Sequence, residues 1–516
     1  LNLSTLTTTM ESLAEQTWDV ILHGTGLQQS LLALALSRSG KQILHLDPNE
    51  YYGGPEAAFS LQEVEEWAAA HAAADNTGPS RVFSSATVSK PEVVTGSGPS
   101  LSFPRAYSLA LAPQIIHTRS ELVKQLVSSR AFRQIEFLAV GSFFIYTPPS
   151  SISEDERASI VPIPSSREAV FSTTAIPARA KRSLMKFLKF VFDYNSEEQR
   201  GTWTPHADKP LSEFLATDFK LDASLQSYIV TLTLSLDGGV STKDGLAAIH
   251  RHLSSMGAFG PGFAAVYPKW GGLSEIAQVG CRACAVGGAV YMLGTGVKAT
   301  RPLDAQENGA RFEVDLTSDI TVKSRTLIRG AEHAASETQR VSRMTVVVNS
   351  SLLSLFENVV EGAPTPAVAV IAIPAGSIKD VASPYPIYVF AHSSETGECP
   401  SGQSVLYLVT PKTSTSGGAL EKALASVLSV LGEGGNRPQA IYKIAYEQAK
   451  AASSVSADAS DVLPGLPLDL AFSDTALEPV REAWTKVVAP VADDPDIQYM
   501  KFEDREGVGD EEDIYE

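Results

Sequence analysis

The stretch WDVILHGTGLQQSLLALALSRSGKQILHLD, which runs from Trp18 to Asp47, decides the fold. An apolar run of strand length ends at a Gly24-Thr25-Gly26 turn, a helical segment follows, and a second apolar run closes on Asp47. This order indicates a βαβ unit with two parallel strands. Asp47 lies 23 residues after Gly24, near the place where dinucleotide-binding folds carry an acid for the ribose. The sequence therefore predicts an α/β fold of FAD/NAD(P)-binding type.

One position of the glycine fingerprint departs from the dinucleotide-binding pattern. Gly24 and Gly26 match its first two glycines, but Gln29 stands where the third belongs. That glycine normally lets the helix lie close to the strand, which keeps the helix N-terminus beside the pyrophosphate. A long amide there either displaces the helix or lies in the path of the pyrophosphate. We interpret Gly24, Gly26, Gln29 and Asp47 as a degenerate dinucleotide loop and expect no cofactor; a retained flavin is the alternative.

The loop after the second strand is rich in turn-forming residues, and it carries Tyr51 and Tyr52 before Gly53-Gly54. A tyrosine on a loop that a rigid strand holds is typical of a protein interface. The two tyrosines would equally serve as a lid over the domain's own core. The residues alone leave both interpretations open.

A second stretch, from Tyr267 to Leu293, reads YPKWGGLSEIAQVGCRACAVGGAVYML. Glycine pairs bracket a segment of helix length that carries Glu275 and Arg282. These two residues are seven apart, which places them about two turns, roughly 10.5 Å, along one face of a helix. At that separation the acid and the base do not pair with each other, so each can meet a partner molecule. The alternative is an ordinary solvated helix face.

Composition narrows the class of function. The formal net charge is −18 over 516 residues. Nucleic-acid binding requires a basic face, so this charge argues against a nucleic-acid partner. The three cysteines form no disulfide framework, so we expect a reducing, cytoplasmic location. We interpret Cys281 and Cys284 as small buried residues and expect no metal site, since three cysteines cannot make a four-cysteine zinc site. We expect neither a membrane-spanning helix nor a secretion signal, and Met10 is the expected natural start.

The order of patterns along the chain predicts two domains. Residues 17–147 and 261–500 are expected to form one discontinuous large domain, and residues 165–260, which read as helical throughout, a second one. The apolar stripes of these helices are wide and aromatic. Such stripes fit either the core of a bundle or a groove for an apolar ligand.

The remaining segments are predicted to lie outside these domains. Residues 68–100 have few large apolar residues and are expected to form a surface insertion. Residues 148–164 read as a polar linker, and residues 1–16 and 501–516 as flexible termini.

Two shorter patterns lie between the insertion and the linker. Ser120 is predicted to cap a helix whose apolar stripe is Leu122, Val123, Leu126 and Val127. Residues 135–139 and 142–146 read as a pair of strands.

Two stretches together resemble the family of GDP-dissociation inhibitors and Rab escort proteins. They are WDVILHGTGLQQSLLALALSRSGKQILHLDPNEYYGG and YPKWGGLSEIAQVGCRACAVGGAVYML. The specific features are the GTGL turn without its third glycine, the D-x-N-x-YYGG loop and the later LSE…R…GGAVYML run. Weaker similarity reaches most of the chain. The resemblance implies a flavoprotein-like large domain that no longer uses a flavin, a helical second domain and no catalysis. The insertions at 68–100 and 148–164 resemble escort proteins more than inhibitors.

The resemblance also implies roles for single residues. Tyr52, Glu275 and Arg282 match the family's Rab-binding platform, and Arg105 matches an arginine near it. The helix after Ser120 matches the region that holds the C-terminal tail of the Rab, with the residues Leu122, Val123 and Leu126. The helical block matches the part that docks the transferase and shelters the lipid.

The function that the resemblance implies is that of an escort protein. Such proteins bind newly made GDP-bound Rab GTPases and present their C-terminal cysteines to the Rab geranylgeranyltransferase heterodimer. They then deliver the geranylgeranylated Rab from the cytoplasm to membranes, which they contact transiently. A GDP-dissociation inhibitor that recycles prenylated Rabs is the alternative within the family. An FAD-dependent, amine oxidase-like enzyme is the alternative of another class.

Overall fold

The structure is a computed structural model. It describes residues 12–73, 81–92, 98–149, 157–164, 170, 177–304, 309–331, 333–334, 339–358, 360–379, 381, 383–432, 437–452, 460–489 and 497–503. The segment 165–168, whose Ser165-x-x-Glu168 pattern predicts a capping box, lies outside this part of the chain, as do most of the predicted flexible termini.

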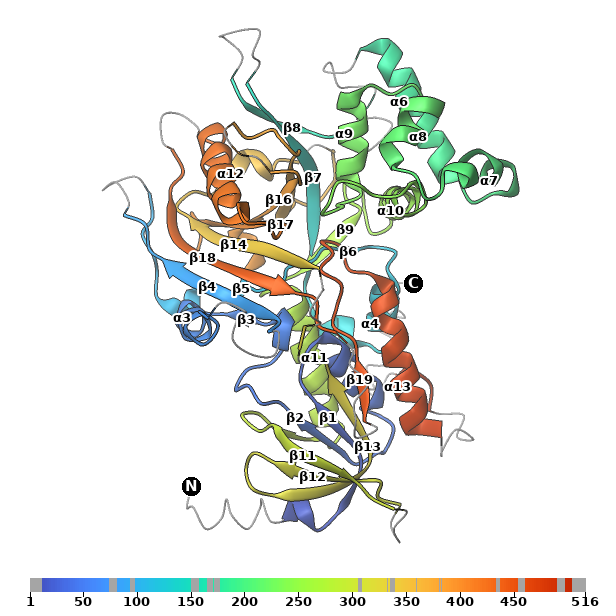
Figure 1. The fold of residues 1–516 in the computed structure, drawn as a ribbon, viewed down its shortest axis with the longest axis vertical. Helices are drawn as coiled ribbons and strands as arrows, with labels where there is room; N and C mark the ends of the chain where they lie inside the picture. The colour runs from blue at the N-terminus through green and yellow to red at the C-terminus, as the bar shows by residue number, and fades with distance from the viewer. Residues whose placement is uncertain are drawn as a thin grey trace, which may run out of the picture.

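The predicted βαβ unit forms the centre of a seven-stranded sheet (Figure 1). Five of its strands are parallel neighbours, in the order β10, β2, β1, β13 and β19, and β11 and β12 continue from β13 as an antiparallel meander. The strand bounds are β1 Thr17–His23, β2 Ile43–Leu46, β10 Val290–Met292, β11 Val297–Pro302, β12 Phe312–Leu316, β13 Thr321–Gly330 and β19 Asp461–Leu463. This topology is of the predicted α/β class.

Helix α2 (Leu27–Leu36), which connects β1 to β2, is buried along its whole length. A helix that is buried on every face must be covered by several other elements. Here α11 (Leu273–Val286) and α13 (Glu478–Val488) pack on α2, and α4 (Glu121–Ser128) contributes to the same hydrophobic cluster. Segments that are hundreds of residues apart therefore meet on one helix.

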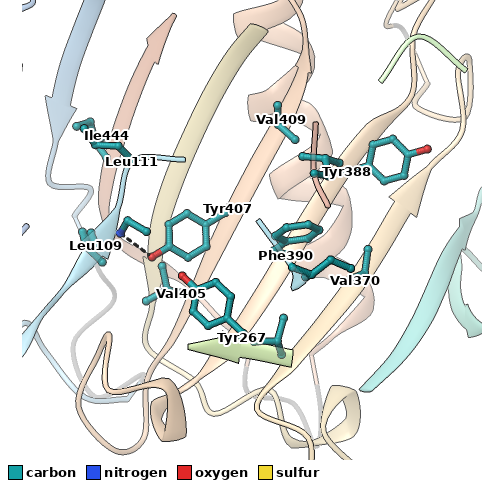
Figure 2. Packing of buried hydrophobic residues seen from close by; sticks show 14 of the residues in the cluster. Leu109, Leu111, Tyr267, Val370, Tyr388, Phe390, Val405, Tyr407, Val409 and Ile444 are labelled. Carbon is teal, nitrogen blue, oxygen red and sulfur yellow. Dashed lines mark hydrogen bonds between the residues drawn. The ribbon is translucent and has the colours of Figure 1, made fainter. Parts of the chain in front are cut away.

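A ten-stranded sheet is the larger of the two main sheets. Along it lie β4 Phe83–Ser89, β18 Ala440–Ala449, β14 Arg340–Val348, β17 Ser404–Pro411, β16 Ile387–Ser393, β15 Val368–Ile373, β7 Phe137–Thr147, β9 Ala265–Pro268 and β6 Ile116–His117, with β8 Ser159–Pro162 beside β7. Alternate residues of its strands enter two clusters: one packs with α12 (Ser416–Val430), the other with α3 (Leu61–Ala70) and the small β3–β5 ribbon (Ala58–Phe59, Leu109–Ala110). Figure 2 shows part of the second cluster.

The predicted helical block forms a separate group at one end of the molecule (Figure 1). Its helices are α6 Ala178–Phe192, α7 Glu197–Trp203, α8 Leu211–Asp218, α9 Ala223–Leu232 and α10 Thr242–Ser255. The wide aromatic stripes form a core of their own, in which Phe187 and Phe214 are fully buried. Phe192 is 49% exposed and lies outside that core. Among the described residues, no helix is long and apolar enough to cross a membrane.

Short 3-10 turns connect many of these elements. They are η1 Ser12–Ala14, η2 Gly54–Glu56, η3 Pro104–Ala106, η4 Ala131–Gln134, η5 Thr204–His206, η6 Leu353–Leu355, η7 Ser394–Thr396 and η8 Asp474–Leu477.

Three predictions about segments are wrong in part. The expected surface insertion at 68–100 contains β4, an edge strand of the large sheet. The expected linker at 148–164 contains β8, which pairs with β7. The expected flexible terminus at 501–516 begins with a packed residue: Phe502 is buried, and its N–H donates to Ser128 O at 3.0 Å.

The expected pair of strands at 135–146 is the single strand β7. Gly141 does not mark a turn there. A Cβ at this position would lie 2.5 Å from Pro366 Cβ, so the glycine permits close packing inside the sheet region.

We expect Phe83→Ala to destabilise the protein by about 3 to 5 kcal/mol, because a buried aromatic side chain would leave a cavity. Phe83 packs edge-on against Trp67 and Tyr446, with centroids 5.2 and 6.0 Å away. Ser89→Ala, at an exposed position of the same strand, is the control and should change stability by less than about 0.5 kcal/mol. Urea unfolding of both variants measures the difference. Equal small effects would mean that β4 is not part of the core.

Candidate functional site

Helix α11 lies in direct backbone contact with α2. A Cβ at Gly280 would lie 2.5 Å from Ser30 O, and one at Gly287 would lie 2.1 Å from Ser37 O. The two glycines are therefore required for the close approach, since real Cβ atoms do not tolerate such distances. Cys281 and Cys284 face inward, buried and free of disulfides, as predicted.

The opposite face of α11 is the one that carries Glu275 and Arg282. Arg282 is exposed and Glu275 is half-buried in the first turn, where the helix dipole favours an acid. Burial raises the pKa of the Glu275 carboxyl, and Arg282 offsets part of this rise. The face thus presents a partly desolvated acid and an exposed base on one rigid helix.

The Tyr52 loop lies beside α11. The ring of Tyr52, which is half-buried, is 6.3 Å from that of Tyr291 on β10. Burial raises the pKa of Tyr52, and Cys281 of α11 and Asp47 add to the rise. Gly53 N–H donates to Thr25 O at 3.2 Å, which ties the loop to the β1–α2 turn. The structure therefore brings Tyr52 to the helix that carries Glu275 and Arg282.

A buried carboxylate fixes the segment that leads into α11. Glu398 accepts hydrogen bonds from Tyr267 at 2.7 Å and Tyr407 at 2.8 Å, and His392 Nδ1 lies 2.7 Å from it. Figure 2 shows the Tyr267 and Tyr407 rings close together and the bond from Ala110 N–H to the Tyr407 hydroxyl. Burial, and then Glu398, raise the pKa of both tyrosines well above the ordinary value, so both remain donors.

Arg105 lies in η3, and the chain just after η3 contacts the segment that leads into α11. Arg105 is exposed, and Ser108, three residues later, donates from Oγ to Trp270 O at 3.0 Å. Trp270 is itself 52% exposed and precedes α11. Glu398 could not be predicted from local sequence patterns, because its partners lie up to 131 residues away.

The predicted tail-contacting residues need a correction. Leu122, Val123 and Leu126 are 0%, 6% and 1% exposed, and they form the inner face of α4 within the cluster around α2. Ser120 caps α4 as predicted, since its side chain accepts from Leu122 N–H at 3.2 Å. An apolar stripe that fills the protein core is not available to an external peptide. Of the four predicted stripe residues, only Val127 is exposed, at 44%.

The degenerate dinucleotide loop is filled by the chain's own side chains. Asp47 Oδ2 accepts from Thr25 N–H and from Thr25 Oγ1, both at 2.7 Å. Glu56 Oε2 accepts from Leu27 N–H, at the N-terminus of α2, at 2.9 Å. The side-chain amide of Gln29 reaches Gly26 O and Gly330 N at 3.2 and 3.1 Å. The role of Glu56 could not be predicted from the sequence, because only the folded loop brings this residue to the N-terminus of α2.

These residues do not fit a flavin dinucleotide. In dinucleotide-binding folds the N–H groups at the helix N-terminus receive the pyrophosphate. Here the buried Glu56 carboxyl already accepts one of them, so that this N–H is not available to a pyrophosphate. The Gln29 amide spans the gap to β13, where a Cβ at Gly330 would lie 2.0 Å from the amide group. Among the described residues, no three His, Cys, Asp or Glu side chains are grouped to hold a metal ion.

Comparison with known proteins gives the family. The model of the family described as "GDI: GDP dissociation inhibitor" matches residues 14–454. The Rab proteins geranylgeranyltransferase component A of Saccharomyces cerevisiae is 29% identical over 396 residues, which are 76% of this chain and 61% of the yeast protein. Rab escort protein 1 of Arabidopsis thaliana is 26% identical over 471 residues, with 80% of each chain covered. The chain thus spans about three fifths of the yeast relative.

A solved structure supports the fold. The Rab GDI of Plasmodium falciparum superimposes with a TM-score of 0.64 at 20% identity, over 92% of this chain and 98% of that one. At this identity the likeness shows the fold alone.

We expect Gly280→Ala to destabilise the protein by about 1 to 3 kcal/mol, because the new Cβ would push α11 away from α2. The control is Gly418→Ala in α12, where no atom lies within 4 Å of the new Cβ. The free energy of unfolding of that variant should rise by about 0.4 to 1 kcal/mol, because alanine reduces the conformational freedom of the unfolded chain. Urea unfolding gives both values. A neutral Gly280→Ala would show that the close approach does not constrain α11.

Glu56 should make stability depend on pH. Burial raises its pKa from 4.5 to about 7, so the folded chain keeps a proton that the unfolded chain has lost between these values. The contribution of Glu56 to the free energy of unfolding is therefore at its maximum below pH 4.5. It falls by up to about 3 kcal/mol as the pH rises to 7. The difference in free energy of unfolding between Glu56→Gln and the unmodified protein should therefore grow by about that amount from pH 5 to pH 8, in favour of the variant. Urea unfolding at both values measures it, with the exposed Glu198→Gln as control. A gain that does not depend on pH would contradict the assignment.

Proposed function

Because the chain belongs to the GDP dissociation inhibitor family, we propose that it is an escort protein for Rab GTPases and a non-catalytic accessory subunit of Rab geranylgeranyltransferase. The main support is the similarity to component A and to Rab escort protein 1. Further support is the face of α11 that carries Glu275 and Arg282. Its partners would be GDP-bound Rabs, the transferase heterodimer and the geranylgeranyl group of the product. It would work in the cytoplasm and touch membranes only when it delivers that product.

The platform is the surface made by Tyr52, Glu275, Arg282 and Arg105. Two of these residues are exposed and two are half-buried. A half-buried tyrosine, a partly desolvated acid and an exposed arginine on neighbouring elements are the composition of an interface hot spot. The helix and loop that carry them are held by the α2–α11 contact and by Glu398, so little order would have to be gained on binding.

An escort role also answers a physical problem of the reaction. The C-terminal tail of a small GTPase is flexible, so a transferase that reads only the tail has little to recognise. A carrier that grips the folded GTPase raises the local concentration of the tail at the transferase. Each geranylgeranyl group has about 20 carbons, and at about 0.8 kcal/mol per buried carbon it needs a carrier in water.

A GDP-dissociation inhibitor is the alternative that the family name and the Rab GDI fold favour. It would extract prenylated Rab from membranes and would not support prenylation. The two roles differ in one assay. Purified chain, a GDP-bound unprenylated Rab, the transferase heterodimer and labelled geranylgeranyl diphosphate are mixed, and transfer of the label is followed. Transfer that requires the chain supports the escort role; transfer that the chain does not increase contradicts it.

We expect Arg282→Ala to weaken binding of a GDP-bound Rab by about 1 to 3 kcal/mol, the range of interface hot spots. The exposed Arg311, which precedes β12, provides a matched control, and its replacement by Ala should leave the affinity unchanged. Calorimetric titration measures both, and circular dichroism checks the fold. If Arg282→Ala binds as tightly as the unmodified chain, Arg282 is not an anchor of the interface.

A further inference from the structure

A cavity of about 280 Å³ lies where the β1–α2 turn, the Tyr51 loop and α3 meet. Its floor is formed by Glu56 and the N-terminus of α2, and its wall by Tyr51, Trp67 and Phe83. The rim residues Pro48 and Pro464 are exposed or half-buried, so the cavity opens to solvent there. This volume is just below that of pockets for drug-sized ligands, so only a small molecule would fit.

The lining of this cavity is acidic. Asp47 and Glu56 line it, and no Lys or Arg is among its described lining residues. The Asp47 oxygens are occupied by Thr25 and by Asn49, whose N–H and Nδ2 donate at 2.8 and 2.9 Å. Glu56 receives bonds from Leu27 N–H and from its own backbone N–H, and a carboxylate has further acceptor sites. Glu56 is therefore the group that can take a further donor from inside the cavity.

Aromatic rings cover the other side. Trp67 meets Phe83 edge-on with centroids 5.2 Å apart, and His71 stacks on Trp67 at 4.5 Å. Tyr51 stands edge-on to Phe59 at 4.7 Å. A carboxyl group and aromatic rings that line one cavity form a combination that attracts an organic cation, through the charge of the acid and the quadrupole of the rings.

We propose that this cavity binds a small organic cation with an apolar or aromatic body, such as a primary ammonium ion. The ammonium group would donate to Glu56, and the apolar body would lie against Trp67 and Phe83. Anions, including the phosphates of a dinucleotide, are excluded by the same carboxylate. The proposal concerns the chain alone and does not depend on the escort role.

Several titratable groups line the same cavity as Glu56. On the adjacent elements they are His23 of β1, Asp47 after β2, Tyr51 of the loop and His71 after α3. Arg343 of β14 lines a smaller adjoining cavity that Glu56 also lines. Burial lowers the pKa of His71, so its ring carries no charge to compete with the ligand at neutral pH. Since the pKa of Glu56 is raised to about 7 by burial, binding of a cation should strengthen as the pH rises from 6 to 8.

The test is titration of the full chain with benzylammonium at pH 8, followed by calorimetry and by ligand-observed NMR. Benzyl alcohol and benzoate serve as the neutral and anionic matches. We expect benzylammonium to bind at least tenfold more tightly than benzyl alcohol, and benzoate not to bind. Binding at pH 6 should be weaker, and at pH 7 it should release protons to the buffer.

Two variants make the outcome specific to this cavity. Glu56→Gln should lose at least tenfold in affinity for benzylammonium, whereas Glu50→Gln, an exposed acid of the same loop that does not line the cavity, should bind as the unmodified chain does. A larger change of the buried Trp67 could prevent folding, so the variant to use at this position is Trp67→Phe, which keeps an aromatic ring in the wall. Equal affinity for the amine and the alcohol, unchanged binding by Glu56→Gln, or no binding of benzylammonium at millimolar concentration would each overturn the proposal.

Discussion

The contact between α2 and α11 is the constraint on which the rest of the structure depends. Backbone oxygens of α2 lie where side chains of α11 would begin, so only glycine at 280 and 287 allows the two helices to meet. Helix α2 is itself buried against the parallel sheet, which makes α11 an extension of that rigid frame. The outer face of α11 is therefore presented in a fixed orientation, and the Tyr52 loop, tied to the β1–α2 turn, is fixed beside it.

The same turn explains why this fold need not serve a dinucleotide. The N-terminus of a helix attracts an anion, and in this chain the anion is internal: the Glu56 carboxylate accepts the Leu27 N–H. Asp47, which in a dinucleotide fold would meet the ribose, instead holds Thr25 and Asn49. The polar groups of a cofactor site are thus satisfied within the chain, and they stiffen the loop that carries Tyr52.

How much could be predicted from the sequence depended on the range of the contacts. Periodicity and glycine spacing predicted the βαβ unit and α11 correctly, because both are local patterns. Strand β4 was missed because its residues, FSSATVS, are mostly small, and only the neighbouring β18 makes them a strand. The stripe of α4 was identified correctly but assigned to a ligand, although an apolar stripe is most simply the side that faces the core. Glu56 and Glu398 could not be found, since their partners are 29 and up to 131 residues away.

Amide hydrogen exchange of the full chain, alone and with a GDP-bound Rab, shows whether the GTPase binds at the face formed by α11 and the Tyr52 loop. Protection should appear at residues 49–54 and along 272–286, and the buried inner face of α4 should not change. Protection confined to other elements, with these two segments exchanging as in the free protein, would contradict the account.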